Sequence, residues 1–316
     1  MAAGKNLSRM RIKLSSNSKD RFLLQTPGGK GIWKGNTYIL NEPVEACDAW
    51  VVYENLYGEE STICPPDKLI MLTGEPQEVR KYAPYWTKKF SMVRSVQAGI
   101  RHPDLQVGQT ALPWHLGRSY DQLASTDLPL KTGDISIICS NKAMTRGHRQ
   151  RLAFVEQLLQ LCPMPRFGRG FHALADKWEG LAPFRYSLAI ENSRHPHYWT
   201  EKIADCFLAG TVPIYWGAPD IGDYFPAEAM IILDSLDPEK VALIIKAEAT
   251  PEAYQRRLPA LREAKRRILE DYNLFEVIHQ MLRARQSTDQ PALVTLGPER
   301  RSRVYRLYLR LRSMFG

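Results

Sequence analysis

Short apolar runs alternate with stretches of helical periodicity along most of this sequence. In the first part of the chain, four apolar runs predict buried strands at residues 9–16, 49–55, 68–75 and 89–95. A helix is predicted at residues 77–86, between the last two of these runs. Buried strands that alternate with helices are typical of parallel α/β domains.

The second part of the chain repeats the alternation more clearly. Strands are predicted at residues 134–140, 165–171, 186–192, 211–217 and 229–234. Helices are predicted at residues 148–161, 200–209, 238–249 and 251–285. The last helix should kink at Pro259, because proline removes a backbone hydrogen-bond donor. Between the two parts, residues 103–132 are rich in proline, glycine and polar side chains, which predicts a linker.

A length of 316 residues fits two domains. We predict an N-terminal α/β domain at residues 1–130, a C-terminal α/β domain at residues 131–285, and a linker with a tail at residues 286–316. Two such domains usually bind their ligand in the cleft between them, at the carboxyl ends of the parallel strands. Functional residues should therefore lie where the predicted strands end.

The composition narrows the possible partners and locations. The net charge is +9, but residues 299–316 hold six arginines and one glutamate, which leaves +4 for the rest of the chain, so a nucleic-acid surface is not required. Five cysteines without a CxxC pair indicate buried free thiols rather than disulfides or a zinc site. No apolar run approaches the ~18 residues of a membrane span, and the N-terminus lacks the apolar core of a secretion signal. We therefore expect a cytoplasmic protein.

The segment FRYSLAIENSRHPHYWTEKIADCFLAGTVPIYWGAPDIGDYFP, at residues 184–226, combines strand ends with the start of a helix. Its first strand ends at Glu191 and Asn192, and Thr200 is a suitable N-cap for the helix that follows. The polar residues beside this helix start are Tyr198, Glu201 and Lys202. In isolation they would form only a solvated first turn. Here the helix starts between two strand ends, and the free amide groups at a helix start attract anions. In this position, Tyr198, Glu201 and Lys202 favour a site for a diphosphate sugar.

This segment resembles the donor-binding signature of the α-1,3-fucosyltransferases, inverting enzymes of the GT-B type that use GDP-fucose. The resemblance continues upstream through SNKAMTRGHRQRLAFVEQL and FGRGF, and so covers most of residues 134–235. A weaker likeness surrounds MLTGEP in the first part of the chain. The resemblance implies an α/β protein with the GT-B fold, in which two Rossmann-like domains face a central cleft, and with a C-terminal helical extension.

The resemblance also implies roles for individual residues. Arg151 would contact the diphosphate, with Arg149 as the alternative. Glu75, in the TGEP context, would be the general base, although by position alone it would be an exposed turn residue. The other donor-binding positions are Tyr198 and Lys202 at the phosphates, Glu201 at the ribose or fucose hydroxyls, and Gly168, Glu191 and Asn192 around the same pocket.

The chemistry of such a transfer explains these residue types. A single displacement at the anomeric carbon needs one base for the acceptor hydroxyl and no protein nucleophile, and Glu75 can supply that base. The leaving GDP gains negative charge, which Lys202, Arg151 and the amide groups of the helix start can stabilise. Because the sequence lacks a DxD pair, we predict no metal and no other cofactor.

Two other motifs carry less weight. TPGGKG, at residues 26–31, lacks the GK[ST] ending of a phosphate loop, so it predicts a turn. His195 and His197 lie two positions apart in a loop without a third ligand, so they predict surface residues rather than a metal site.

We therefore predict a fucosyltransferase that moves fucose from GDP-fucose to a glycan acceptor, in an α-1,3 linkage to N-acetylglucosamine. Two alternatives stay open: a non-catalytic GDP-sugar-binding subunit of a glycan-assembly complex, and a transferase for another GDP-sugar. A nucleic-acid-binding protein is disfavoured, because basic and aromatic residues interleave only in the tail.

The C-terminal tail has a pattern that would suit an acceptor at a membrane. The segment from Arg300 to Phe315 predicts an amphipathic helix. Its apolar residues recur every three or four positions, and arginines occupy the other face. Such a helix can contact an anionic membrane, which would suit a lipid-linked precursor of a lipopolysaccharide, protein glycan or other surface glycan at the inner face of the cell membrane. The same stripe could instead pack on the protein's own surface or on another copy, and the oligomeric state stays open.

Overall fold

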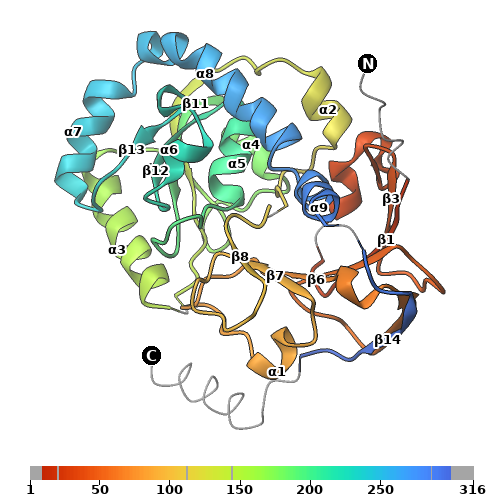
Figure 1. Ribbon diagram of the computed structural model, residues 1–316. Coiled ribbons are helices and arrows are strands. Elements are labelled where there is room, and N and C mark those ends of the chain that lie inside the picture. Colours follow the sequence, from red (N-terminus) through yellow and green to blue (C-terminus); the bar gives the residue numbers. More distant parts are fainter. Residues whose placement is uncertain (1–8, 20, 112, 144, 286, 300–316) are drawn as a thin grey trace.

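The computed structural model describes residues 9–19, 21–111, 113–143, 145–285 and 287–299. Within these residues, two mainly parallel sheets form the centres of two α/β domains, and a two-stranded sheet completes the fold (Figure 1). The N-terminal domain is drawn mainly in red to yellow and the C-terminal domain mainly in green to light blue. The predicted pair of α/β domains is thus confirmed.

The sheet of the N-terminal domain has seven strands in the order β2-β3-β1-β4-β6-β7-β8. These are β1 (Arg11–Ser16), β2 (Ile32–Trp33), β3 (Asn36–Leu40), β4 (Ala49–Tyr53), β6 (Leu69–Leu72), β7 (Met92–Ser95) and β8 (Leu105–Val107). All neighbouring strands are parallel except β2 and β3. Every residue of β4 and β6 is buried, as expected for central strands that are covered on both faces.

The sheet of the C-terminal domain has five parallel strands in the order β10-β9-β11-β12-β13. These are β9 (Gly133–Ile138), β10 (Arg166–Phe167), β11 (Phe184–Ile190), β12 (Val212–Trp216) and β13 (Ile231–Ile232). The helices of this domain are α3 (Arg146–Leu161), α4 (Lys177–Leu181), α5 (Glu201–Leu208), α6 (Ile221–Tyr224), α7 (Pro238–Glu248) and α8 (Pro251–Glu270). Because α5 buries Ile203 and Phe207 completely, its first turn is held at the carboxyl end of β11.

Two predicted segments have a different structure. Residues 77–86, predicted as a helix, form turns and the short helix α1 (Pro84–Thr87). Ala83 is extended, with φ −73° and ψ 132°, because a residue before proline disfavours helical geometry. Within the predicted linker, β8 adds the last strand of the first sheet, and α2 (Tyr120–Ser125) follows behind a capping box at Ser119.

The long helix predicted at residues 251–285 is two helices. α8 ends at Glu270, and α9 (Leu274–Arg283) begins after Asn273. The side chain of Asn273 accepts a hydrogen bond from the backbone N–H of Phe275, as an N-cap does. The break therefore comes from this cap and not from Pro259, which lies inside α8.

The end of the described chain returns to the N-terminal domain. α9 packs on the first sheet, where the ring of Phe275 lies 4.9 Å from that of Tyr38. β14 (Ala292–Leu296) then pairs antiparallel with β5 (Glu60–Cys64), and Figure 1 shows this blue segment along the N-terminal domain. The structure thus departs from the predicted division, which assigned residues 274–285 to the C-terminal domain and residues 286–316 to a linker and tail.

The predicted tail helix lies outside the described residues. None of the helices in the described part of the chain combines the length and the apolar character needed to cross a membrane. Short 3-10 turns complete the described structure, at Phe22–Gln25, Pro27–Gly29, Pro66–Lys68 and Ala227–Ala229. The second of them belongs to TPGGKG, which is a turn as predicted.

Candidate active site

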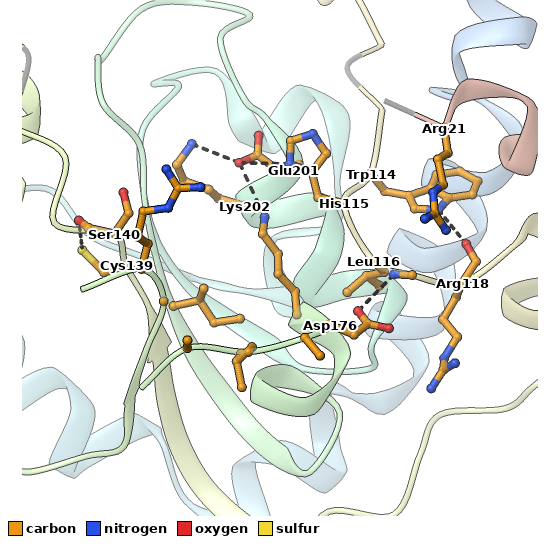
Figure 2. A pocket seen from close by; sticks show the side chains of 18 of the residues that line it. Arg21, Trp114, His115, Leu116, Arg118, Cys139, Ser140, Asp176, Glu201 and Lys202 are labelled. Carbon is orange, nitrogen blue, oxygen red and sulfur yellow. Dashed lines mark hydrogen bonds and ion pairs between the residues drawn. The ribbon is translucent and has the colours of Figure 1, made fainter. Parts of the chain in front are cut away.

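Two neighbouring cavities lie between the domains, at the carboxyl ends of the parallel strands. Their volumes are about 760 Å³ and about 480 Å³. His115, Glu201 and Lys202 line both, so the cavities adjoin each other at these side chains. Figure 2 shows the larger cavity, with the three side chains close together on one side of it.

The start of α5 brings a cation to this junction. Thr200 caps the helix, and its hydroxyl accepts a hydrogen bond from the backbone N–H of Lys202 at 3.4 Å. The Lys202 ammonium lies 3.0 Å from Glu191 Oε2 and 3.0 Å from Thr200 Oγ1. Burial would lower the pKa of Lys202, but Glu191 and Glu201 together raise it, so the side chain is charged.

Glu191 supports this arrangement. Its side chain is 1% exposed and accepts hydrogen bonds from the backbone N–H and the hydroxyl of Thr200, both at 2.8 Å. Burial raises the pKa of Glu191, while Lys202 acts in the opposite direction. The sequence resemblance placed Glu191 with the donor-binding residues. Among the described residues, however, those that line the two cavities do not include Glu191. Its side chain instead holds Thr200 and Lys202 in place.

Helix α3 presents Arg151 to the larger cavity. Its guanidinium donates hydrogen bonds to Asn192 Oδ1 at 2.6 Å and to the carbonyl oxygen of Ser140 at 3.3 Å. Arg149, the alternative, is exposed, donates to the carbonyl oxygen of Ala143, and is not among the described residues that line either cavity. Of these two arginines, Arg151 is therefore the one whose side chain lines a cavity.

A glycine turn forms another wall of the larger cavity. Gly168 has a φ of +120°, and a Cβ at this position would lie 2.4 Å from the carbonyl oxygen of Cys139. Only glycine therefore lets the chain after β10 pass this close to the end of β9. The turn places Gly168 in the same cavity wall as Ser140.

Glu201 lies among three basic side chains. Its Oε1 is 3.6 Å from the ammonium groups of Lys177 and Lys202 and 3.9 Å from His115 Nδ1. Burial would raise the pKa of Glu201, but these neighbours outweigh burial and lower it. Glu201 is therefore an ionised acceptor that can bind hydroxyl groups of a ligand.

The N-terminal domain contributes Glu75 to the smaller cavity. β6 ends at Leu72, and the following loop brings Glu75 into the cavity wall that also contains Tyr198 and Asn192. Burial, and then the nearby carboxylate of Glu54, raises the pKa of Glu75 to about 7. Only the backbone of Glu75 forms hydrogen bonds with the described residues, so its carboxylate is free to exchange a proton.

Glu54 lies in the same wall, but its carboxylate is occupied. It accepts hydrogen bonds from the Tyr82 hydroxyl at 2.6 Å, the Arg80 guanidinium at 2.5 Å, and the backbone N–H groups of Gly74 and Glu75. The two neighbouring carboxylates therefore differ in what they can do. Glu54 holds the loop, and Glu75 is available to a ligand.

Sequence reasoning did not identify Glu54, Arg80 or His115. A signal for Glu54 exists, because the strands AWVVYEN and YSLAIEN both end in Glu-Asn, at Glu54 and Glu191. Both follow inner strands of their sheets, β4 and β11. Neither Arg80 nor His115 belongs to a recognisable motif, so the sequence offers no comparable signal for them.

The two loop histidines contact protein carboxylates. His195 Nε2 lies 2.9 Å from Glu78 Oε1, and His197 Nδ1 lies 2.8 Å from Asp220 Oδ2. Across the described ranges, no group of three or more His, Cys, Asp and Glu side chains is arranged to hold a metal ion.

The C-terminal domain is similar in sequence to known fucosyltransferases. Residues 128–258 match the family model described as glycosyltransferase family 10 (fucosyltransferase), C-terminal. The chain is 32% identical over 107 residues to the α-(1,3)-fucosyltransferase FucT of Helicobacter pylori, a match that covers 33% of this chain and 22% of that protein. It is 28% identical over 152 residues to an α-(1,4)-fucosyltransferase of Arabidopsis thaliana, which covers 40% of this chain and 36% of that protein. Both matches thus span well under half of the relatives' lengths.

The whole fold is similar to solved fucosyltransferase structures. A crystal structure of an α1,3-fucosyltransferase has a TM-score of 0.51 at 20% identity, with 90% of this chain and 91% of that chain covered. A crystal structure of an α1,3-fucosyltransferase with GDP has a TM-score of 0.50 at 19% identity, with 87% and 94% covered. Likeness at this identity establishes the fold, which is GT-B. The chain therefore has the GT-B fold, and its residues 128–258 match the model of glycosyltransferase family 10, the fucosyltransferases.

Proposed function

We propose that the protein is an inverting glycosyltransferase that moves fucose from GDP-fucose to a hydroxyl group of a glycan. The observation that carries this proposal is Glu75, in the same cavity wall as Lys202. Its carboxylate is half-buried, has a pKa of about 7 and forms no side-chain hydrogen bond with the described residues. Such a carboxylate can take a proton near neutral pH. The match of residues 128–258 to the fucosyltransferase family model supports fucose as the sugar.

GDP-fucose would bind in the larger cavity and extend into the smaller one. Arg151, Lys202 and the amide groups at the start of α5 would bind the diphosphate, because charged donors at a helix start suit this anion. Glu201 would accept hydrogen bonds from ribose or fucose hydroxyls. The crystal structure of the similar enzyme with GDP supports a guanosine diphosphate in this fold.

The transfer would be a single displacement. Glu75 takes the proton of the acceptor hydroxyl while the acceptor oxygen bonds to the anomeric carbon of fucose. The bond between that carbon and the β-phosphate oxygen breaks, and its electron pair stays with GDP. Lys202 and Arg151 stabilise the added negative charge, so we propose that no metal is required. Glu75 then releases the proton to water.

For the acceptor, we propose an α-1,3 linkage to N-acetylglucosamine in a surface glycan. The Helicobacter pylori relative is named for α-(1,3) transfer, which supports this linkage, whereas the Arabidopsis relative is named for α-(1,4) transfer. The acceptor would approach Glu75 through the smaller cavity, whose wall on the side of the N-terminal domain includes Asn17 and Val79. A lipid-linked acceptor at the inner face of the membrane would suit the basic amphipathic pattern of residues 300–315.

A transfer assay separates this function from the alternatives. The purified protein is supplied with GDP-fucose, or with GDP-mannose, and a panel of acceptors that contain galactose or N-acetylglucosamine. We expect release of GDP from GDP-fucose and a fucosylated product in the mass spectrum. GDP binding without transfer to any acceptor would indicate a non-catalytic subunit, and faster transfer from GDP-mannose would replace fucose as the donor sugar.

A further inference from the structure

The last described residue of the chain contacts the loop that carries Glu75. Glu299 follows β14 and is 8% exposed. Its carboxylate accepts hydrogen bonds from Arg80 at 2.6 Å and from the backbone N–H of Ala83 at 2.7 Å. Its own backbone N–H donates to Asn55 Oδ1 at 2.8 Å. Three contacts therefore anchor Glu299 to the N-terminal domain.

Arg80 connects Glu299 to the smaller cavity. Its guanidinium binds Glu299 Oε2 at 2.6 Å and Glu54 Oε2 at 2.5 Å. The three side chains are between 4% and 12% exposed, so water and salt screen these ion pairs little. The guanidinium also lies 4.7 Å from the ring of Tyr82, whose hydroxyl donates to Glu54. Glu299, Arg80 and Glu54 thus form a buried row of alternating charges that ends at the cavity.

Glu54 links this row of charges to the base. Its carboxylate binds the backbone N–H groups of Gly74 and Glu75. Glu54 has a φ of +68°, a left-handed conformation that a residue other than glycine keeps only where its surroundings impose it. From another side, Gln97 Nε2 donates to the carbonyl oxygens of Glu75 and Arg80 at 2.7 and 2.9 Å. The backbone of Glu75 is therefore held, while its carboxylate stays free.

We propose that Glu299 is a positioning residue for Glu75, acting through Arg80 and Glu54, so that the C-terminal segment of the chain forms part of the acceptor-activating site. This inference rests on the proposed function, in which Glu75 is the base. A base acts only within hydrogen-bond reach of the acceptor hydroxyl, and a misplacement of about 1 Å can lower a rate by ~10²-fold. The C-terminal segment thus helps to set the rate without touching either substrate.

Loss of Glu299 should loosen the loop and spare the donor site. Without its carboxylate, the backbone N–H of Ala83 loses its acceptor, and among the described residues Arg80 keeps its ion pair with Glu54 and its contact with the Tyr82 ring. Glu299 is not among the described residues that line either cavity, and Lys202 belongs to the other domain. The value of kcat should therefore fall, while KM for GDP-fucose should not rise.

The test compares full-length Glu299→Ala and Glu299→Gln with the unchanged protein and with Glu59→Gln. Glu59 is an exposed glutamate of the same domain and serves as the matched control. For Glu299→Ala we expect kcat to fall roughly 10- to 100-fold, with KM for GDP-fucose and Kd for GDP changed by less than about twofold. Glu299→Gln should lose less, because its amide oxygen can still accept from Ala83.

Amide hydrogen exchange gives a readout that does not depend on transfer. In Glu299→Ala, amides of residues 73–83 should exchange faster than in the unchanged protein, while residues 184–216 should exchange as before. An unchanged kcat in the folded variant overturns the proposal, and so does a lower kcat with unchanged exchange in the loop. If Glu299→Ala does not fold, kcat and amide exchange are both measured on Glu299→Gln instead. If the unchanged protein transfers no fucose, the proposed function fails, and exchange alone decides whether Glu299 holds the loop.

Discussion

Replacing Glu75 with glutamine keeps the shape of the side chain and removes its ability to accept a proton. Loss of a positioned general base lowers the rate by roughly 10²- to 10⁴-fold. GDP should bind as before, because Glu75 lines the smaller cavity and Arg151 the larger one. The measurements are kcat with saturating GDP-fucose and acceptor, and the Kd for GDP by calorimetry. The exposed control Glu59→Gln should match the unchanged protein in both.

The raised pKa of Glu75 also predicts how activity depends on pH. Only the ionised carboxylate can take a proton, so kcat/KM should fall about tenfold per pH unit below a midpoint near the pKa, about 7. Glu75→Gln has no such group and should lack this acidic limb.

The same pKa shift has a consequence for stability. The ordinary pKa of the glutamate is 4.5, which we assign to the unfolded chain, and the folded value is about 7. As pH rises, Glu75 therefore keeps its proton to a higher pH in the native state than in the unfolded chain. The free energy of unfolding falls by up to about 3 kcal/mol between about pH 4.5 and about pH 7. Glu75→Gln should remove this loss, so it should be more stable than the unchanged protein at about pH 8 and not at about pH 4. Urea unfolding at the two pH values measures the difference.

Three results would contradict this reasoning. A near-normal rate in Glu75→Gln would show that another group takes the proton. An acidic limb that persists in the variant would assign the pH dependence elsewhere. Equal stability of the two proteins at about pH 8 would mean that burial does not disfavour the charged form of Glu75.

Three further proposals can be tested: the binding of the diphosphate by Lys202 and Arg151, transfer without a metal ion, and the membrane contact of the C-terminal tail. Lys202→Ala and Arg151→Ala should each weaken GDP binding by about 1.5–3 kcal/mol, because each would remove a charged hydrogen bond that we propose to the diphosphate. Arg149→Ala should leave GDP binding unchanged. Normal affinity for GDP in both of the first two variants, measured by calorimetry, would place the nucleotide elsewhere. Chelation of divalent ions should leave most of the transfer activity, and a complete, reversible loss would contradict the metal-free proposal. A variant without residues 300–316 still contains Glu299. It should transfer fucose to a soluble acceptor but no longer co-sediment with anionic vesicles. If the full-length protein does not bind such vesicles at low salt, the proposed membrane contact is wrong.

Local patterns in the sequence were enough to locate most of the strands and the start of α5. The central strands β4, β6 and β12 are continuous apolar runs, because strands covered on both faces need apolar side chains on both. The start of α5 was visible from Thr200, since an N-cap acts within one helical turn. These features depend on neighbours a few residues away, so the order of residues determines them.

Which residues meet in space depended on packing. Arg149 and Arg151 are two positions apart, and so about 200° apart around α3, and only the packing of this helix decides which of them faces the cavity. The row formed by Glu54, Arg80 and Glu299 likewise exists because α9 and β14 return to the first domain. Even the pKa of Glu75 follows from its burial beside a carboxylate on another strand end. Contacts between residues this far apart in the chain, and the electrostatics that follow from them, arise only when the tertiary structure brings their elements together.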